Sequence, residues 1–220
     1  MNGPWDQVVQ LIEQQGEVPE ELNSLELISD FNRSRPESTI ELVDLEGLKR
    51  FPNLQKLRIV GFEIRSITGL AEHGLLKHLD LSFNDISDSS SFGALESLKT
   101  LKLQGNRLCK LGSIAGLTQL VELNLYKNKI ESVAELKLMP KLISLNLTDN
   151  GLRSLDGVEN CPNLQELYCW DNQVSSLEPL RSLEQLHVLF CHENQITDFS
   201  PIHDLRKLEQ IDTSSNPMGP

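Results

Sequence analysis

Apolar positions return along this chain with a period of 22 residues. Asparagine follows the first leucine of each period by eight residues, and Phe62 stands at the first such place. The leucines are Leu54, Leu76, Leu98, Leu120, Leu142, Leu164, Leu186 and Leu208. The asparagines are Asn84, Asn106, Asn128, Asn150, Asn172, Asn194 and Asn216. A fixed period of this length predicts a stack of similar coils, each in contact with its neighbours.

Each period predicts one short strand and one bend. In the unit that starts at Leu120, the alternation around Leu123 and Leu125 is typical of a strand, and strands of successive units should pair in parallel. The asparagine should close the bend, because its amide both donates and accepts hydrogen bonds to its own and the neighbouring coil. The later apolar residues, spaced by three, predict a short helical or 3₁₀ segment; they are Ile130, Val133, Leu136 and Met139.

The N-terminal part departs from the period and predicts a helical cap over residues 1–39. Trp5, Val8, Val9 and Ile12 have helical spacing, Pro4 suits a first helical position, and Gly16 can end the helix. A second helix is expected from Pro19, with Leu22, Leu25 and Ile28 buried, followed by a loop at 32–38. A partial repeat begins at Ile40, so residues 40–220 form the repeat domain, with eight full units from Leu54. The segment Asn216–Pro220 resembles the start of a C-terminal cap, and we expect the cap itself to be absent.

The register and its motif resemble the leucine-rich repeat family, in its 22-residue class. That class includes the regulatory subunit of protein phosphatase 1 and the bacterial internalins. The resemblance implies an α/β solenoid, a right-handed curved coil with a parallel β-sheet on the concave face and short 3₁₀ or helical segments on the convex face. It also implies a surface used mainly to bind other proteins, and we expect the chain to be a monomer.

Charge excludes several classes of partner. The net charge of −12 argues against binding nucleic acid or inserting into an anionic membrane, and the first 50 residues carry eleven Asp and Glu against four Lys and Arg. The start of the sequence lacks the basic segment followed by an apolar segment that is typical of a secretory signal, so we expect a cytoplasmic protein. Cys169 and Cys191 fall on core positions of consecutive coils, about 4.8 Å apart. Two buried thiols are the favoured interpretation, and a disulfide is the alternative.

Aromatic residues gather on the predicted concave face, although they make up only 5% of the chain. Three residues per strand should point outward, and in the sixth and seventh coils these positions hold four rings. Exposed rings with charge at the rim are typical of a protein-binding surface. Ring pairs that only stabilise the sheet are the alternative. The predicted partner-binding residues are Tyr126, Asp149, Glu166, Tyr168, Trp170, Asp171, Phe190, His192 and Glu193.

A slot is expected between Tyr126 and Trp170. The two residues lie two coils apart, about 10 Å, with Thr148 as the floor between them. Asp149, Asp171 and Glu166 would make its surroundings negative. A Lys or Arg side chain of the partner would fit there. The N-terminal half of the face has mixed charge instead, at Arg58, Asp80, Lys102, Glu122 and Lys127.

Enzymatic and metal-binding interpretations find little support in the sequence. His192 near Asp171 and Glu193 is the nearest approach to a catalytic or metal site, but no exposed nucleophile accompanies it. We therefore predict no catalytic residue, no metal site and no cofactor. The preferred function is a non-catalytic protein-binding module. The family resemblance implies a phosphatase regulator or a cytoskeletal or signalling adaptor. A targeting or autoregulatory domain of a larger multidomain protein and a bacterial surface array are the alternatives.

Overall fold

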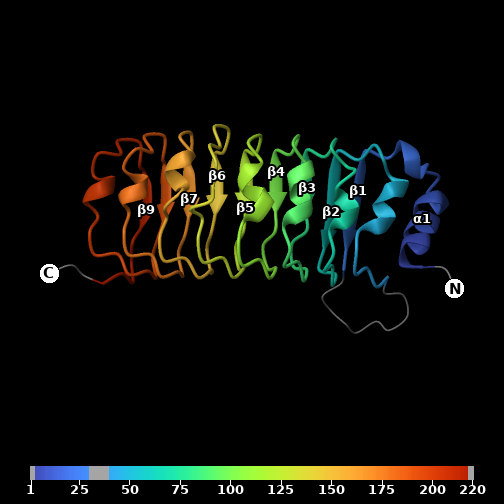
Figure 1. Ribbon diagram of the computed structural model, residues 1–220, viewed down its shortest axis with the longest axis horizontal. Helices are drawn as coiled ribbons and strands as arrows, with labels where there is room; N and C mark the ends of the chain where they lie inside the picture. Colours follow the sequence, from blue (N-terminus) through green and yellow to red (C-terminus); the bar gives the residue numbers. More distant parts are fainter. Residues whose placement is uncertain (1–2, 30–39, 218–220) are drawn as a thin grey trace.

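The computed structural model describes residues 3–29 and 40–217 of the 220-residue chain. The coils stack side by side along the long axis, and α1 covers one end (Figure 1). Nine parallel strands form one sheet in chain order, from β1 to β9. They are β1 Ser24–Ile28, β2 Lys56–Val60, β3 His78–Asp80, β4 Thr100–Lys102, β5 Glu122–Asn124, β6 Ser144–Asn146, β7 Glu166–Tyr168, β8 Val188–Phe190 and β9 Gln210–Asp212.

Short helices occupy the return path of most coils. After α1 (Pro4–Gln14), the described helices are all 3₁₀. They are η1 Pro19–Glu21, η2 Glu46–Arg50, η3 Thr68–Leu70, η4 Ser90–Ala94, η5 Gly112–Gly116, η6 Val158–Asn160, η7 Glu178–Leu180 and η8 Ser200–Ile202. Between β5 and β6 the described chain turns without a 3₁₀ helix. There Lys137 and Met139 donate their backbone N–H groups to Ala115 and Asn160 of the flanking coils.

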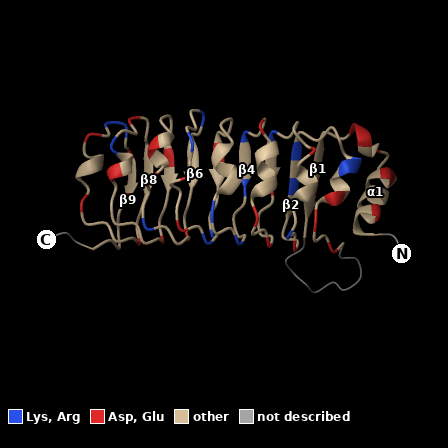
Figure 2. Cartoon of the chain, in the orientation of Figure 1, with Lys and Arg blue, Asp and Glu red and all other residues tan. Residues whose placement is uncertain are grey.

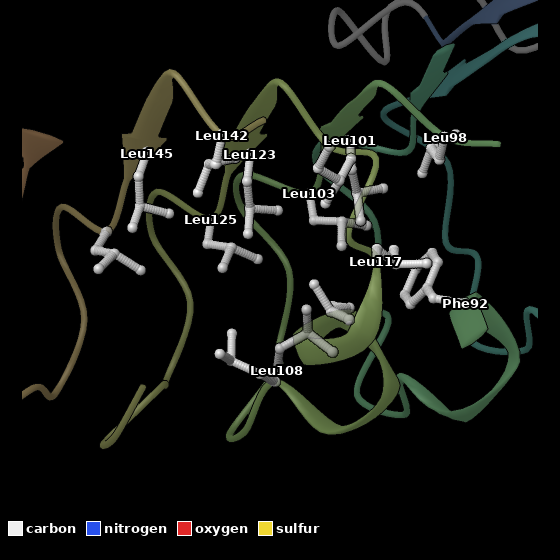
Figure 3. Packing of buried hydrophobic residues seen from close by; sticks show 14 of the residues in the cluster. Phe92, Leu98, Leu101, Leu103, Leu108, Leu117, Leu123, Leu125, Leu142 and Leu145 are labelled. Carbon is white, nitrogen blue, oxygen red and sulfur yellow. The ribbon is translucent and has the colours of Figure 1, made fainter. Parts of the chain in front are cut away.

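The core lies between the strands and the return segments. Leucines from successive coils point inward and pack against one another, as Leu101, Leu123 and Leu145 do in consecutive strands (Figure 3). The strand register sets Leu101 opposite Leu123 and Leu123 opposite Leu145, so each core position repeats from coil to coil. Burying these apolar side chains is the main stabilising term for the stack. In the partial repeat that begins at Ile40, apolar residues such as Leu42 and Phe51 are buried as well.

The asparagine of each period joins two coils. Asn150 accepts a hydrogen bond from Ile130 N–H and donates to the carbonyls of Leu125 and Leu147, each at 3.0 Å. Ile130 and Leu125 belong to the preceding coil, and Leu147 to its own. The same three-way pattern holds at all seven positions, Asn84, Asn106, Asn128, Asn150, Asn172, Asn194 and Asn216. We call these seven residues the asparagine ladder.

The first predicted helix is present and the second is wrong. α1 buries Trp5, Val8 and Ile12. From Ser24, however, the chain forms β1, the first strand of the sheet, and Ile28 is 52% exposed instead of buried. Pairing with β2 satisfies the backbone groups of this segment and sets Leu25 opposite Leu57. The expected loop at 32–38 lies outside the described residues.

The helix α1 closes the first coil through Trp5. Its ring lies 6.2 Å from the Phe51 ring, and Asp6 pairs with Arg50 at 2.6 Å. Gly47 leaves room for the indole, because a Cβ atom there would lie 2.0 Å from Trp5 Cγ. The packing of the cap thus requires a glycine at position 47 of η2.

Gly47→Ala should loosen this cap. Because the added methyl overlaps the indole, we expect the free energy of unfolding to fall by about 1–3 kcal/mol, the usual cost of overpacking. Urea unfolding followed by circular dichroism measures the change. Gly74→Ala is the matched control, since its Cβ would have its nearest neighbour at 4.0 Å. Equal losses in the two variants would contradict the role assigned to Gly47.

Asn150→Ala should cost more than Asn146→Ala. The first change leaves backbone groups of two coils without a hydrogen-bond partner. Each buried unpaired group lowers the free energy of unfolding by about 1–3 kcal/mol, so a total loss of about 3 kcal/mol is expected. Asn146 accepts one bond, from Thr148 N–H at 3.0 Å, and should cost about 1 kcal/mol. Thermal and urea unfolding of both variants would compare them. A cost for Asn150→Ala no greater than that for Asn146→Ala would show that the ladder is dispensable.

Candidate functional site

The sheet register gathers the predicted aromatic residues on one surface. We call the outward side of the strands the sheet face. Asn146 of β6, Tyr168 of β7 and Phe190 of β8 lie opposite one another, in one column of the sheet. Two residues further along each strand direction, Thr148, Trp170 and His192 continue a second column. Tyr168, Trp170, Phe190 and His192 are half-buried and lie outside the core cluster, so the rings belong to the surface.

The rings form two contact groups, which together we call the ring patch. Tyr168 and Phe190 meet edge to face, with ring centroids 5.5 Å apart. Trp170 and His192 are stacked at 5.0 Å with an angle of 11° between the ring planes. Tyr126 leans against Trp170 from the other side at 6.3 Å and 34°. Contacts of this kind hold the rings in place.

The predicted open slot between Tyr126 and Trp170 is wrong. The rings were expected about 10 Å apart, the separation of two coils. They are 6.3 Å apart because both lean over Thr148, which is only 1% exposed. Ser82, in the same column and also expected outside, is likewise buried. Leaning together covers apolar ring surface that two upright rings would expose to water.

A second period-22 device ends many of the strands. In the column of Tyr168, the coils with Asp or Asn accept a hydrogen bond from the backbone N–H two residues later. Such bonds are typical of Asx turns. The pairs are Asp80 with Ser82, Asn124 with Tyr126, Asn146 with Thr148 and Asp212 with Ser214, each at 3.0 Å.

Tyr168 and Phe190 replace that acceptor with a ring. Neither side chain can take the hydrogen bond at this place, and no acceptor bonds the N–H of Trp170 or of His192 among the residues described. The two ring coils therefore give up a stabilising bond that four other coils keep. The sequence carries this signal, because Asp and Asn recur in the column, although the spacing of the apolar and aromatic residues does not reveal it.

The acidic residues beside the rings sit in a left-handed turn. Asp149, Asp171 and Glu193 have φ of 52°, 53° and 54°. The conformation belongs to this position of the coil, since Gly61 and Gly105 adopt it too. Non-glycine residues are uncommon there and cost free energy. The two glycines in the column are the sequence signal that could have revealed it.

The carboxylates beside the rings carry uncompensated charge. None of the four forms an ion pair with any Lys, Arg or His that the structure describes; they are Asp149, Glu166, Asp171 and Glu193. Glu166 instead hydrogen-bonds Tyr168. Burial chiefly, and then the charge and hydrogen bond of Glu166, raise the pKa of the Tyr168 hydroxyl above its usual value. We call these four carboxylates the acidic rim.

The N-terminal half of the sheet face compensates its own charge. Arg58 pairs with Glu26 at 2.5 Å and with Asp80 at 3.1 Å, and Lys102 pairs with Glu122 at 2.9 Å. Blue segments of the ribbon show Lys and Arg positions on β2 and β4 in Figure 2. These side chains line an open depression of about 580 Å³. Four of the five residues of the predicted mixed charge, Arg58, Asp80, Lys102 and Glu122, are thus in ion pairs, and Lys127 forms none with the acids that the structure describes.

His192 has a different neighbour from the one predicted. Its Nδ1 lies 3.3 Å from Asp212 Oδ2, in the next coil, with an angle that makes no hydrogen bond. The pair gains attraction only when the ring is protonated. Asp171 and Glu193 make no such contact with it, and the described residues contain no group of three or more metal-ligating side chains. Nothing in this arrangement brings a nucleophile to His192.

The described thiols are unpaired. Cys169 and Cys191 are buried, as is Cys161, while Cys109 is exposed. Burial raises the pKa of Cys191 to about 12 and that of Cys169 well above its ordinary value. These sulfur atoms therefore pack as small apolar groups. No helix within the described ranges is long and apolar enough to cross a bilayer.

Comparison with known proteins points to one family. A family model described as Leucine Rich repeats (2 copies) matches residues 140–182, and one described as Leucine Rich Repeat matches residues 75–95. No curated protein sequence matches the chain. Among solved structures, internalin C2 of Listeria monocytogenes has a TM-score of 0.79 and 28% identity, covering 87% of this chain and 80% of that chain.

Two further solved structures have the same fold. A leucine-rich repeat protein of Leptospira interrogans has a TM-score of 0.64 and 26% identity, covering 81% of this chain and 53% of its own. TLR13, solved as a complex with ssRNA13, has a TM-score of 0.77 and 24% identity, covering 97% of this chain and 30% of its own. The likeness to TLR13 concerns the fold alone.

The Asp212 carboxylate makes part of the stability depend on pH. Its pKa lies below the ordinary value of 3.8, because Ser214 donates its backbone N–H and its hydroxyl, with a smaller contribution from His192. A lowered folded-state pKa gives stability that is present above pH 3.8 and is lost as the pH falls through the folded-state pKa. In Asp212→Asn the amide still accepts from Ser214 but carries no charge.

The stability advantage of wild type over Asp212→Asn should therefore shrink in acid. Urea unfolding at several pH values between about 6 and 2.5 would measure it. A difference that stays constant over this range would show that the Asp212 charge has no part in the stability of the last coil.

Proposed function

Because this chain is a leucine-rich repeat protein, we propose that it is a non-catalytic binding protein that holds a partner protein on the sheet face of β6, β7 and β8. The leucine-rich repeat fold is a typical protein–protein interaction module, and its members are generally non-enzymatic. Curved solenoids of this kind present one long concave surface, which suits an extended contact. The ring patch and the acidic rim together form the binding surface.

The unpaired acidic rim carries this proposal. Acids in the N-terminal half of the face have cation partners, whereas the four beside the ring patch have none. A cluster of like charges costs free energy in the isolated chain, and a basic partner would remove that cost. Tyr168 and Phe190 also support the proposal. They stand where other coils have an Asp or Asn that accepts a hydrogen bond, so stability is lost there, and they supply the aromatic side chains on which interfaces depend.

The partner is expected to present Lys or Arg side chains to the rim. We infer a monomer in the cytoplasm, where the buried unpaired thiols would remain reduced. A regulated enzyme such as a phosphatase catalytic subunit, or a cytoskeletal or signalling protein, would fit such a surface. The partner would be held by the rings and oriented by the rim charge.

Column-matched substitutions test the surface without disturbing the coil. Trp170→Thr installs the residue that Thr148 supplies one coil earlier, and Phe190→Asn installs the residue found at Asn124 and Asn146. The Asn can accept from His192 N–H, so the free energy of unfolding should change by less than about 1 kcal/mol. Each variant should lose about 2 kcal/mol of binding free energy, as for an interface hot spot.

The partner captured by wild type from its native source would be purified and titrated calorimetrically against each variant. His78→Ser, which installs the Ser144 residue type in the N-terminal half, is the control and should bind like wild type. Affinity of wild type should also fall with added salt, because the rim charge is screened. Unchanged affinity in both ring variants would rule out the ring patch as the binding surface.

A further inference from the structure

Two buried polar atoms flank Tyr126 in the same column of the sheet face. Gln104 lies one coil before Tyr126 and Thr148 one coil after, as the strand register shows. Gln104 Oε1 and Thr148 Oγ1 are both shielded from solvent and have no hydrogen-bond partner among the described residues. Buried polar atoms are nearly always paired, so two unpaired ones beside the same ring call for an explanation.

Of the two rings that lie over Thr148, Tyr126 is held by fewer ring contacts than Trp170 and can move more easily. Trp170 is held on its far side by the stacked His192 ring, at 5.0 Å and 11°. Tyr126 meets Trp170 at 6.3 Å and a tilt of 34°, without a parallel stack. A planar group between two rings needs about 7 Å, twice the carbon contact distance of about 3.5 Å. The closed pair therefore has no room for one, and a change of the Tyr126 rotamer would provide it.

Both unpaired atoms can gain partners when Tyr126 moves. Rotation away from Trp170 carries the phenol toward Gln104, whose Oε1 is an acceptor for the phenolic hydroxyl. The space left over Thr148 is bounded by the Trp170 ring on one side and has the Thr148 hydroxyl as its floor. Asp149, which follows Thr148 and has no cation partner among the described residues, makes this space attractive to a positive charge.

We propose that Tyr126 is a gate over a binding site for an arginine side chain, which rests on the binding function proposed above. The guanidinium stacks on the exposed face of Trp170, donates an N–H to Thr148 Oγ1 and is neutralised by the acidic rim. Arginine fits better than lysine, because its planar group can stack on a ring and donate in the ring plane at the same time. The site is closed in the free chain and opens as the partner enters.

The gate predicts that removing Tyr126 raises affinity. When the competent state is a fraction of the population, the apparent dissociation constant is the intrinsic one divided by that fraction. An open fraction of about one tenth would make Tyr126→Ala bind about tenfold more tightly. If Tyr126 only contacted the partner, Tyr126→Ala would change the affinity in the opposite direction, because loss of the contact would weaken binding.

The experiment uses N-acetyl-arginine amide as the probe and the full chain. The chain has two tryptophans, Trp5 and Trp170, so two indole N–H signals in an NMR spectrum report the cap and the site separately. We expect the probe to shift the Trp170 signal and leave the Trp5 signal unmoved. Tyr126→Ala should lower the dissociation constant about tenfold. Thr148→Val in the Tyr126→Ala background should raise it about tenfold, through loss of one hydrogen bond to a charged group.

Two controls complete the test. Tyr126→Phe keeps the ring and removes the hydroxyl that pairs with Gln104 in the open state, so it should bind the probe more weakly than wild type. N-acetyl-lysine amide should bind at least about tenfold more weakly than the arginine probe to Tyr126→Ala. Equal or weaker arginine binding by Tyr126→Ala, or equal binding of the two amides, would overturn the gate. If that happens while Trp170→Thr still weakens partner binding, the gate is wrong and the proposed function stands.

Discussion

The asparagine ladder is the interaction on which the rest of the structure depends. A coil of 22 residues turns its backbone inward after each strand, which would leave buried N–H and C=O groups without partners. One amide side chain meets donors and acceptors of its own coil and of the coil before it, as Asn150 does with Leu125, Ile130 and Leu147. Each coil is therefore fixed in register with its neighbour. All the remaining positions of the period are aligned from coil to coil as a result.

Register turns a linear pattern into columns on a surface. One half of the sheet face pairs its charges internally, through Arg58 and Lys102. The other half gathers rings and leaves its carboxylates unpaired. The division follows from local choices, because Tyr168 and Phe190 take the place of strand-ending Asx residues. Two adjacent coils lack a stabilising hydrogen bond, and the carboxylates next to them have no ion-pair partner. Both features are expected of a surface whose sequence is selected for binding.

Much of the fold could be predicted because the period is so regular. The strands, the core leucines and the first helix α1 follow from the spacing of apolar residues alone. The segment from Ser24 is a strand, although the spacing of three between Leu22, Leu25 and Ile28 predicts a helix. Alternation within Ser24–Ile28 was the competing signal, and a neighbouring strand with unpaired backbone groups decided between them.

By itself, the sequence determined the stacking, the coil register and which residues share a column, because these depend on the period and on backbone hydrogen bonding. It also placed Tyr168, Trp170, Phe190 and His192 on one surface. Only the tertiary structure decided how those side chains rest against one another. The closed contact of Tyr126 with Trp170 and the approach of His192 to Asp212 depend on side-chain rotamers and on burial across coils, which no spacing along the chain encodes.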